Sequence, residues 1–118
     1  MAPKRGDSVA PPPGRDEFEI KYATKEAVEG WRELGKQAPG NTRAAWHEMR
    51  TNPAPVPPTE RHHQLKSDLA TAVHNGRELP QWQIEVTGGG RVWYLYDKEK
   101  RVCWLKLART GHPRQTDK

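Results

Sequence analysis

Apolar and polar residues alternate near the start of the chain and again through its second half. Residues 17–22 alternate Phe, Ile and Tyr with Glu and Lys, which is the pattern of a half-buried strand. Three more strands are predicted over residues 82–86, 91–97 and 101–108, because a Gly-rich turn and a charged turn separate these mainly apolar segments. Residues 62–69 are a further strand candidate.

The region between the first strand and the others shows helical spacing. Apolar residues in 24–51 recur every three or four positions in two stretches, which predicts two amphipathic helices. We expect Thr24 to cap the first helix and either Asn41 or Thr42 to cap the second, with the Pro-Gly pair at 39–40 between them. The order β-α-α-(β)-β-β-β predicts an α+β domain, with two helices from the N-terminal half packed on one face of a small antiparallel sheet.

The eleven prolines are concentrated in two segments. Residues 1–15 contain few apolar residues and a run of three prolines, so we expect a disordered tail that makes few contacts. Residues 52–59 are a Pro-rich stretch that predicts an extended connector on the surface. A single domain is therefore expected over residues 16–118.

Composition restricts the class of protein. The chain has 118 residues, of which 33% are hydrophobic, and its mean hydropathy is −1.05. No apolar run approaches the roughly 18 residues of a membrane-spanning helix, and the start lacks the apolar segment of a secretory signal. The single cysteine, Cys103, excludes an internal disulfide and a multi-cysteine zinc site. We therefore expect a cytoplasmic domain with no membrane partner.

Positive charge lies in the second half of the chain. The formal net charge is +5, and residues 61–118 hold eleven Lys and Arg against six Asp and Glu, whereas residues 1–60 hold nine of each. A basic segment favours a polyanionic partner such as a nucleic acid. A solvated basic face without a partner is the alternative that charge alone leaves open.

The sequence lacks the motifs of several kinds of functional site. The glycines at 88–90 are followed by Arg91 and not by Gly-Lys-Ser/Thr, so they form a hairpin turn and no phosphate-binding P-loop. His62 and His63 are adjacent, and on a strand their rings point to opposite faces, so they cannot chelate one metal together. We expect no metal and no small-molecule cofactor. The remaining Lys, Arg and His residues suit metal-independent phosphodiester cleavage, because RNA carries its own nucleophile, the 2′-hydroxyl.

Three segments of the second half resemble a known family. They are His-Gln-Leu-Lys-Ser-Asp-Leu at 63–69, Trp-Gln-Ile-Glu-Val at 82–86 followed by Gly-Arg-Val-Trp-Tyr-Leu-Tyr-Asp at 90–97, and Ala-Arg-Thr-Gly-His-Pro-Arg at 108–114. In their order and spacing they are similar to the RelE/ParE superfamily of bacterial toxins, especially its RelE- and HigB-like members. The family usually has a glycine in place of Ser67 and a tighter link than residues 71–80.

The resemblance implies a RelE-like fold and the toxin component of a type II toxin–antitoxin system. It implies an endoribonuclease that acts on mRNA in the ribosomal A site and leaves a 2′,3′-cyclic phosphate and a 5′-hydroxyl. The implied partners are mRNA, the ribosome and a cognate antitoxin of the helix-turn-helix type. 

The resemblance also assigns functional residues. They are four catalytic residues, Lys66, Arg91, Arg109 and His112, and two residues that bind RNA or phosphate, His63 and Arg114. Arg91 and Arg109 would hold the scissile phosphate, and His112 would transfer a proton with Lys66 or His63 as its partner. We expect Lys66, Arg91, Arg109 and His112 to lie on one concave face.

Other interpretations stay open at this stage. Arg91 could instead pair with Glu85 across the hairpin, Lys66 could be a solvated residue, and Trp82, Trp93 and Trp104 are expected to pack in the core. A ParE-like protein that binds and inhibits DNA gyrase, without enzymatic activity, is one alternative function. A nucleic-acid-binding module without catalysis is another. An RNase requires its basic residues clustered on one sheet face, whereas a gyrase inhibitor does not.

Overall fold

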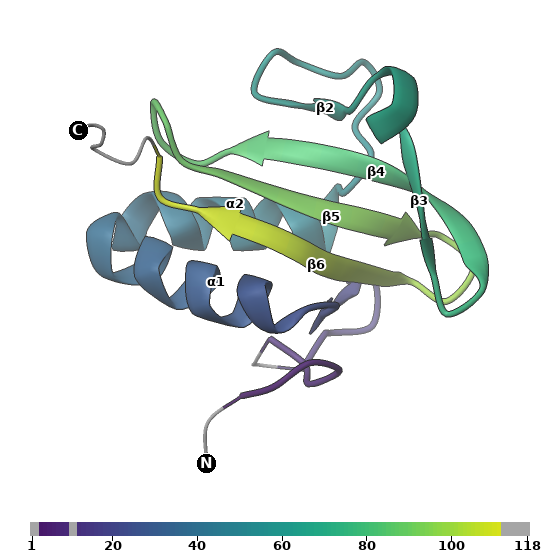
Figure 1. Ribbon diagram of the computed structural model, residues 1–118, viewed down its shortest axis with the longest axis horizontal. Coiled ribbons are helices and arrows are strands. Elements are labelled where there is room, and N and C mark those ends of the chain that lie inside the picture. Colours follow the sequence, from purple (N-terminus) through teal and green to yellow (C-terminus); the bar gives the residue numbers. More distant parts are fainter. Residues whose placement is uncertain (1–2, 10–11, 112–118) are drawn as a thin grey trace.

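The computed structural model describes residues 3–9 and 12–111. Within this part of the chain, two helices lie on one side of a mixed, six-stranded sheet (Figure 1), which confirms the predicted α+β class. The elements are β1 (Glu19–Tyr22), α1 (Lys25–Gln37), α2 (Pro39–Thr51), β2 (His62–Gln64), the 3-10 turn η1 (Ser67–Leu69), β3 (Thr71–His74), β4 (Arg77–Glu85), β5 (Arg91–Asp97) and β6 (Val102–Arg109).

The first helix begins as the sequence predicts. The Oγ1 atom of Thr24 accepts a hydrogen bond from the N–H of Ala27 at 3.0 Å and donates one to the carbonyl of Lys106 at 2.8 Å. Thr24 therefore both caps α1 and ties it to β6. No helix in the described part of the chain is long and apolar enough to cross a membrane.

The start of the second helix differs from the prediction. Ala38 is the N-cap and Pro39 is the first residue of α2, so neither Asn41 nor Thr42 is the cap. Proline favours this first position because its fixed φ suits a helix and its missing N–H has no partner there in any case. The side-chain amide of Asn41 instead donates to the carbonyl of Val86 at 2.9 Å, which attaches α2 to the end of β4.

The strand order is β1-β6-β5-β4-β2, with β3 also paired to β4. The expectation of an antiparallel sheet is wrong for β1, which pairs with β6 in parallel, Glu19 opposite Val102 and Tyr22 opposite Leu105. Only a short hairpin forces neighbouring strands to be antiparallel, and β1 and β6 are separated by both helices and all the other strands. The other strand pairs are antiparallel; this was predicted for the pairs among β4, β5 and β6.

The N-terminal segment makes more contacts than the few that its composition suggests. The N–H of Val9 donates to the carbonyl of Ile20 at 2.6 Å, and the N–H of Gly6 donates to that of Tyr22 at 2.7 Å. Val9 itself is buried, with 6% of its surface exposed. Because β1 is the edge of the sheet, its outer backbone groups need partners, and residues 6–9 supply them.

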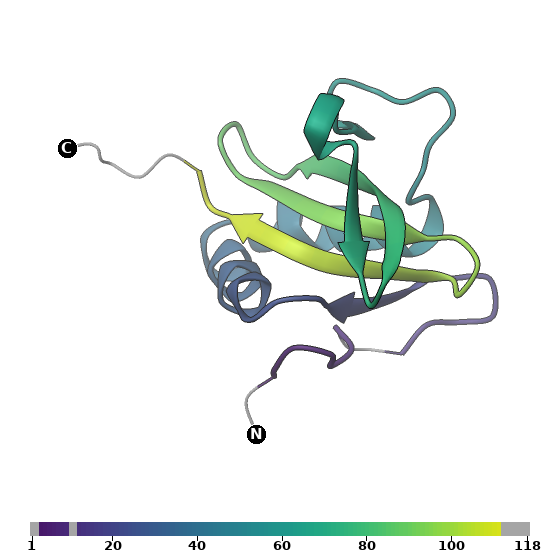
Figure 2. The same ribbon diagram turned by 45° about the vertical axis from the view of Figure 1, so that its right-hand side comes forward.

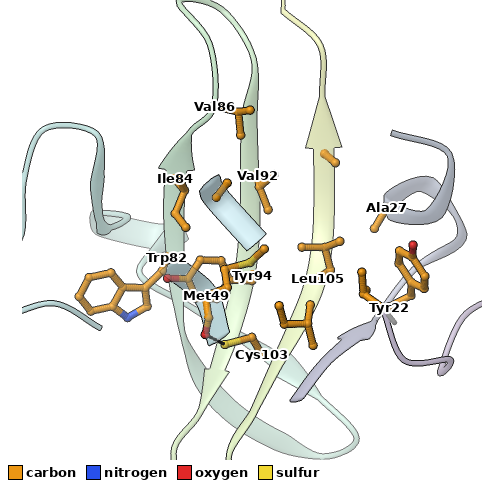
Figure 3. Packing of buried hydrophobic residues seen from close by; sticks show 14 of the residues in the cluster. Tyr22, Ala27, Met49, Trp82, Ile84, Val86, Val92, Tyr94, Cys103 and Leu105 are labelled. Atoms are coloured by element: carbon orange, nitrogen blue, oxygen red, sulfur yellow. Dashed lines mark hydrogen bonds between the residues drawn. The ribbon is translucent and has the colours of Figure 1, made fainter. Parts of the chain in front are cut away.

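The core lies between the helices and the sheet (Figure 3). Cys103 is fully buried there, its thiol donates to the carbonyl of Met49 at 3.5 Å, and burial raises the pKa of the thiol. Helix α1 approaches β6 so closely that a Cβ on Gly30 would lie 1.8 Å from the carbonyl oxygen of Ala108. A side chain at position 30 would therefore push the helix off the sheet.

A hairpin that the sequence analysis missed covers part of the opposite face. Strands β3 and β4 are joined by Asn75 and Gly76, both with positive φ (53° and 78°), as a tight two-residue hairpin turn requires. In Figures 1 and 2, β3 crosses in front of β4 and β5, whereas α2 lies behind the sheet. The predicted strand 82–86 is thus the second half of a longer, bent strand, β4.

Two contacts hold the hairpin down. The ring of His74 lies against that of Trp104 with 4.2 Å between centroids, and the guanidinium of Arg77 donates to the carboxylate of Asp97 at 2.7 Å. Burial favours the neutral form of Asp97, but the hydrogen bonds from Arg77 and the Lys100 N–H outweigh it and keep the pKa of Asp97 below its ordinary value. The hairpin is therefore fixed over one half of this face.

The burial of Val9 gives a direct test of the N-terminal segment. We expect Val9→Ala to lower the free energy of unfolding by about 1.5 kcal/mol, since two buried methylene equivalents are lost. The matched control is Val56→Ala, because Val56 is 94% exposed and should tolerate the same change without loss. Urea unfolding measures both, and equal stability of the two variants would contradict the packing of residues 6–9.

Candidate phosphate-binding face

The half of the sheet that β3 leaves open carries its own set of side chains. Along β5, Val92 and Tyr94 belong to the core, so Arg91 and Trp93 point to the side away from the helices. The strand register places their neighbours on the same side. We call this surface the uncovered face; it consists of His63, Gln83, Glu85, Arg91, Trp93, Leu107 and Arg109.

Arg91 and Arg109 are direct cross-strand partners on the uncovered face. Opposite residues of an antiparallel pair have Cβ atoms about 4.5–5.5 Å apart, and like charges in such a pair are destabilising. The structure thus places opposite each other the two arginines that the resemblance assigned to phosphate binding, although the guanidinium of Arg109 itself contacts Glu26 on α1. Two arginine side chains that extend from opposite positions on neighbouring strands can bind one anion with several oxygens, such as a phosphate.

Arg91 has no intramolecular partner within residues 3–9 and 12–111: its side chain makes no hydrogen bond or ion pair there. The alternative interpretation, a pair between Arg91 and Glu85, is not what the structure contains. Glu85 lies 3.8 Å from Arg61 instead. Arg91 is a half-buried residue, and its guanidinium is therefore available to a ligand.

Arg109 is more loosely held. Its guanidinium lies 3.8 Å from the carboxylate of Glu26 on α1, and both side chains are more than half exposed. Exposed ion pairs of this kind contribute about 0–1 kcal/mol, so an incoming phosphate can displace Glu26 at little cost.

The other predicted site residues lie at different distances from the arginines. His63 is half-buried and opposite Gln83, so it belongs to the uncovered face, about 10 Å from β5 at two strand spacings. Lys66 is exposed, and it follows Leu65, whose N–H donates to Gln81 at 2.8 Å. Gln81 is four residues along β4 from Glu85, the residue opposite Arg91 in the strand register, so the structure does not bring Lys66 to the arginine pair.

The C-terminal candidates cannot be placed in the same way. His112 and Arg114 lie outside the described residues. The last described residue, Gly111, approaches the Gly-rich turn, since a Cβ on Gly111 would be 3.4 Å from the carbonyl carbon of Gly89.

Trp93 and Gln83 are members of the uncovered face that the sequence analysis did not assign to it. The indole Nε1–H of Trp93 donates to Oε1 of Gln83 at 2.7 Å, and both side chains are half-buried. Trp82 packs in the core as expected, and Trp104 lies under His74, but Trp93 is no member of the core. The signal was present in the sequence, because Trp93 is two residues from Arg91 and strand side chains two apart share a face.

A buried polar cluster supports the sheet from the helix side. His62 points opposite to His63, as predicted, and its Nδ1 contacts the carboxylate of Glu48 at 2.8 Å. Its Nε2 lies 2.5 Å from the hydroxyl oxygen of Tyr94, and that hydroxyl donates its one hydrogen to the carbonyl of Pro53 in the connector. Burial lowers the pKa of His62, although Glu48 opposes this, and it raises the pKa of Tyr94. The cluster therefore joins α2, the connector, β2 and β5.

Among the described residues, no group of three His, Cys, Asp or Glu side chains is arranged to hold a metal ion. The chain was compared with family models, curated proteins and solved structures, and none of them matches it. The candidate site therefore depends on geometry and on the chemistry of its side chains alone.

The cluster around His62 predicts a pH-dependent stability. A histidine whose pKa is lowered by folding destabilises the protein when it is protonated, so stability should fall as the pH drops below about 6.5, by at most about 1.4 kcal/mol per pH unit. His62→Gln should be less stable at pH 8 by about 1–3 kcal/mol, because Glu48 and Tyr94 lose a buried partner. The variant should also have a flatter profile between pH 8 and pH 5.5 in urea unfolding. Parallel profiles for the two proteins would show that His62 does not titrate in this way.

Proposed function

We propose that this chain is a metal-independent endoribonuclease that cleaves mRNA, of the RelE/HigB type. In this proposal its fold is RelE-like, it acts on mRNA bound to the ribosome, and a cognate antitoxin holds it inactive. The α+β arrangement of two helices on a mixed sheet is compatible with this fold.

One observation carries the proposal: Arg91 is half-buried on the uncovered face, directly opposite Arg109, and has no partner among the described residues. Placing two cations opposite each other costs stability. Glu26 contacts only Arg109, and Glu85, although opposite Arg91, makes no ion pair with it, so no carboxylate of the described residues joins the two arginines. A phosphodiester can bind both. Both residues are on strands of the central sheet, which hold a ligand in a more defined geometry than loops do.

Cleavage of RNA by its own 2′-hydroxyl needs only arginine and histidine side chains, which the uncovered face and the C-terminal segment carry. The 2′-oxygen attacks the neighbouring phosphorus, the bond from phosphorus to the 5′-oxygen breaks, and a 2′,3′-cyclic phosphate and a 5′-hydroxyl result. A base takes the 2′-hydroxyl proton and an acid protonates the leaving 5′-oxygen. Arg91 and Arg109 would stabilise the extra negative charge on the phosphoryl oxygens. Imidazole is the side chain best suited to proton transfer near neutral pH, which favours His63 and His112 for these steps.

The gyrase-inhibitor alternative predicts a different surface. A gyrase inhibitor without enzymatic activity has no need for arginines and a histidine on one sheet face, whereas a ribonuclease does. His63, Arg91 and Arg109 lie on strand positions of the uncovered face, and this clustering favours the RNase over the gyrase inhibitor. A nucleic-acid-binding module without catalysis would bind RNA through the same residues, and the cleavage assay below distinguishes it from the RNase.

Arg91→Gln tests the proposal with two measurements. We expect cleavage of ribosome-bound mRNA to fall by roughly 10²–10³-fold, as when one preorganised donor to a transition-state anion is removed. We expect the free energy of unfolding to stay within about 0.5 kcal/mol of the wild type or to rise, since the Arg91 side chain makes no hydrogen bond or ion pair within the described residues that the change would break. Arg32→Gln, an exposed arginine on α1, is the matched control and should cleave normally.

The products should carry the 2′,3′-cyclic phosphate and the 5′-hydroxyl. Full activity of Arg91→Gln would overturn the site. Absence of cleavage by the wild type, together with inhibition of DNA gyrase, would replace the proposal with the ParE-like alternative.

A further inference from the structure

A pocket of about 240 Å³ lies next to Arg91, between the Gly-rich turn and the end of the connector. It is lined by Glu60, Gln83, Glu85, Gly88, Gly89, Gly90 and Arg91. Its volume lies below the roughly 300–1,000 Å³ of pockets for drug-sized ligands, so one planar ring system is a suitable size of occupant. The three glycines contribute only backbone to the wall, which lets a flat ring approach the chain closely.

The amide of Gln83 has a defined orientation in this pocket. Its Oε1 accepts the indole hydrogen bond from Trp93 at 2.7 Å, so its Nε2 end is the free one. No described residue accepts a hydrogen bond from Nε2 of Gln83. Gln83 therefore offers the two N–H groups of Nε2 to a ligand, whereas its acceptor Oε1 is already engaged by Trp93.

The carboxylates supply the acceptors. Glu60 makes no ion pair or hydrogen bond through its side chain within the described residues, and Glu85 makes only the 3.8 Å contact to Arg61. An ionised carboxylate accepts hydrogen bonds and donates none, and its two oxygens match two parallel N–H groups. The pocket thus combines the amide donor of Gln83 with the carboxylate of Glu60, which can accept hydrogen bonds from two adjacent donors.

Among the RNA bases, guanine presents this pattern. Its Watson–Crick edge carries the acceptor O6 next to the donors N1–H and N2–H. Adenine and cytosine each offer a single amino group beside a ring acceptor, and uracil offers one N–H between two carbonyls, so each would place an acceptor against the carboxylate. Single-stranded RNA exposes these edges for such recognition.

We propose that the pocket binds a guanine base next to the phosphate held by Arg91, with Glu60 as the residue that determines specificity. This inference rests on the proposed function.

Binding of RNA that cannot be cleaved tests the inference. The probes are four fluorescent pentanucleotides that are 2′-O-methylated throughout, with uridine at every position except a central G, A, C or U. Fluorescence anisotropy at low salt with the full chain measures their affinities. We expect the G probe to bind roughly 5- to 150-fold more tightly than the others, which is the discrimination of one good bidentate contact.

Glu60→Gln should abolish this preference while the fold, checked by circular dichroism, stays intact. Removing a negative charge raises the affinity for any RNA, so the readout is the ratio of G to A binding. Glu29→Gln, an exposed glutamate on α1, changes the net charge by the same amount and should keep the wild-type ratio.

The outcomes separate the two proposals. If Arg91→Gln weakens binding of all four probes but the wild type shows no preference, prefers another base, or keeps its preference in Glu60→Gln, the guanine pocket is wrong and the proposed function stands. If no probe binds in a way that depends on Arg91, both proposals are overturned.

Discussion

The unequal covering of the two sheet faces is the constraint on which the rest of this structure depends. Both helices pack on one face and bury the core, so half of every strand's side chains are committed to that side. The β3–β4 hairpin then covers part of the other face, where Gln81 and Leu95 are each only 1% exposed. His74 on Trp104 and Arg77 on Asp97 fix the hairpin there. The remaining half is the uncovered face, and its side chains are available to a ligand.

The composition of that uncovered face differs from an ordinary solvated strand surface. Charged residues on such surfaces usually pair with opposite charges across the strands, which adds stability. Here Arg91 lies between Glu85 on β4 and Arg109 on β6, but the carboxylate of Glu85 contacts Arg61 and makes no ion pair with Arg91. Natural proteins lose some stability at functional sites in this way. The arrangement is explained if a phosphate completes it.

The sequence predicted where the helices and strands lie better than it predicted which strands pair with each other. Both helices, strands β1, β5 and β6 and the second half of β4 follow from hydrophobic spacing, because that spacing reports which side of an element is buried. The local sequence pattern could not predict the parallel pairing of β1 with β6. These strands are the first and the last of the chain, so their relative direction depends on the path of all the elements between them. The β3–β4 hairpin did have a local signal, the Asn75-Gly76 pair between two strand-like stretches, and the polar character of residues 71–80 concealed it.

The site was predictable to a similar extent. The resemblance pointed to Arg91 and Arg109, and the period of two places Trp93 beside Arg91. The pocket could not be predicted, because Glu60 reaches it from the connector, more than twenty residues before the strands that form the other walls. The orientation of the Gln83 amide is likewise a tertiary fact, since it depends on the indole of Trp93 on the neighbouring strand.

The most direct test of the central claim is to locate where RNA touches the protein. A ¹⁵N-labelled sample titrated with a 2′-O-methylated RNA oligonucleotide reports on the Trp indole and Arg side-chain N–H groups by NMR. The account predicts shifts of the Trp93 indole and the Arg91 and Arg109 side chains, which lie on the uncovered face, and none for Trp31 and Trp46, which pack on the helix side. Shifts confined to Trp31 and Trp46, with Trp93 and Arg91 unchanged, would contradict it.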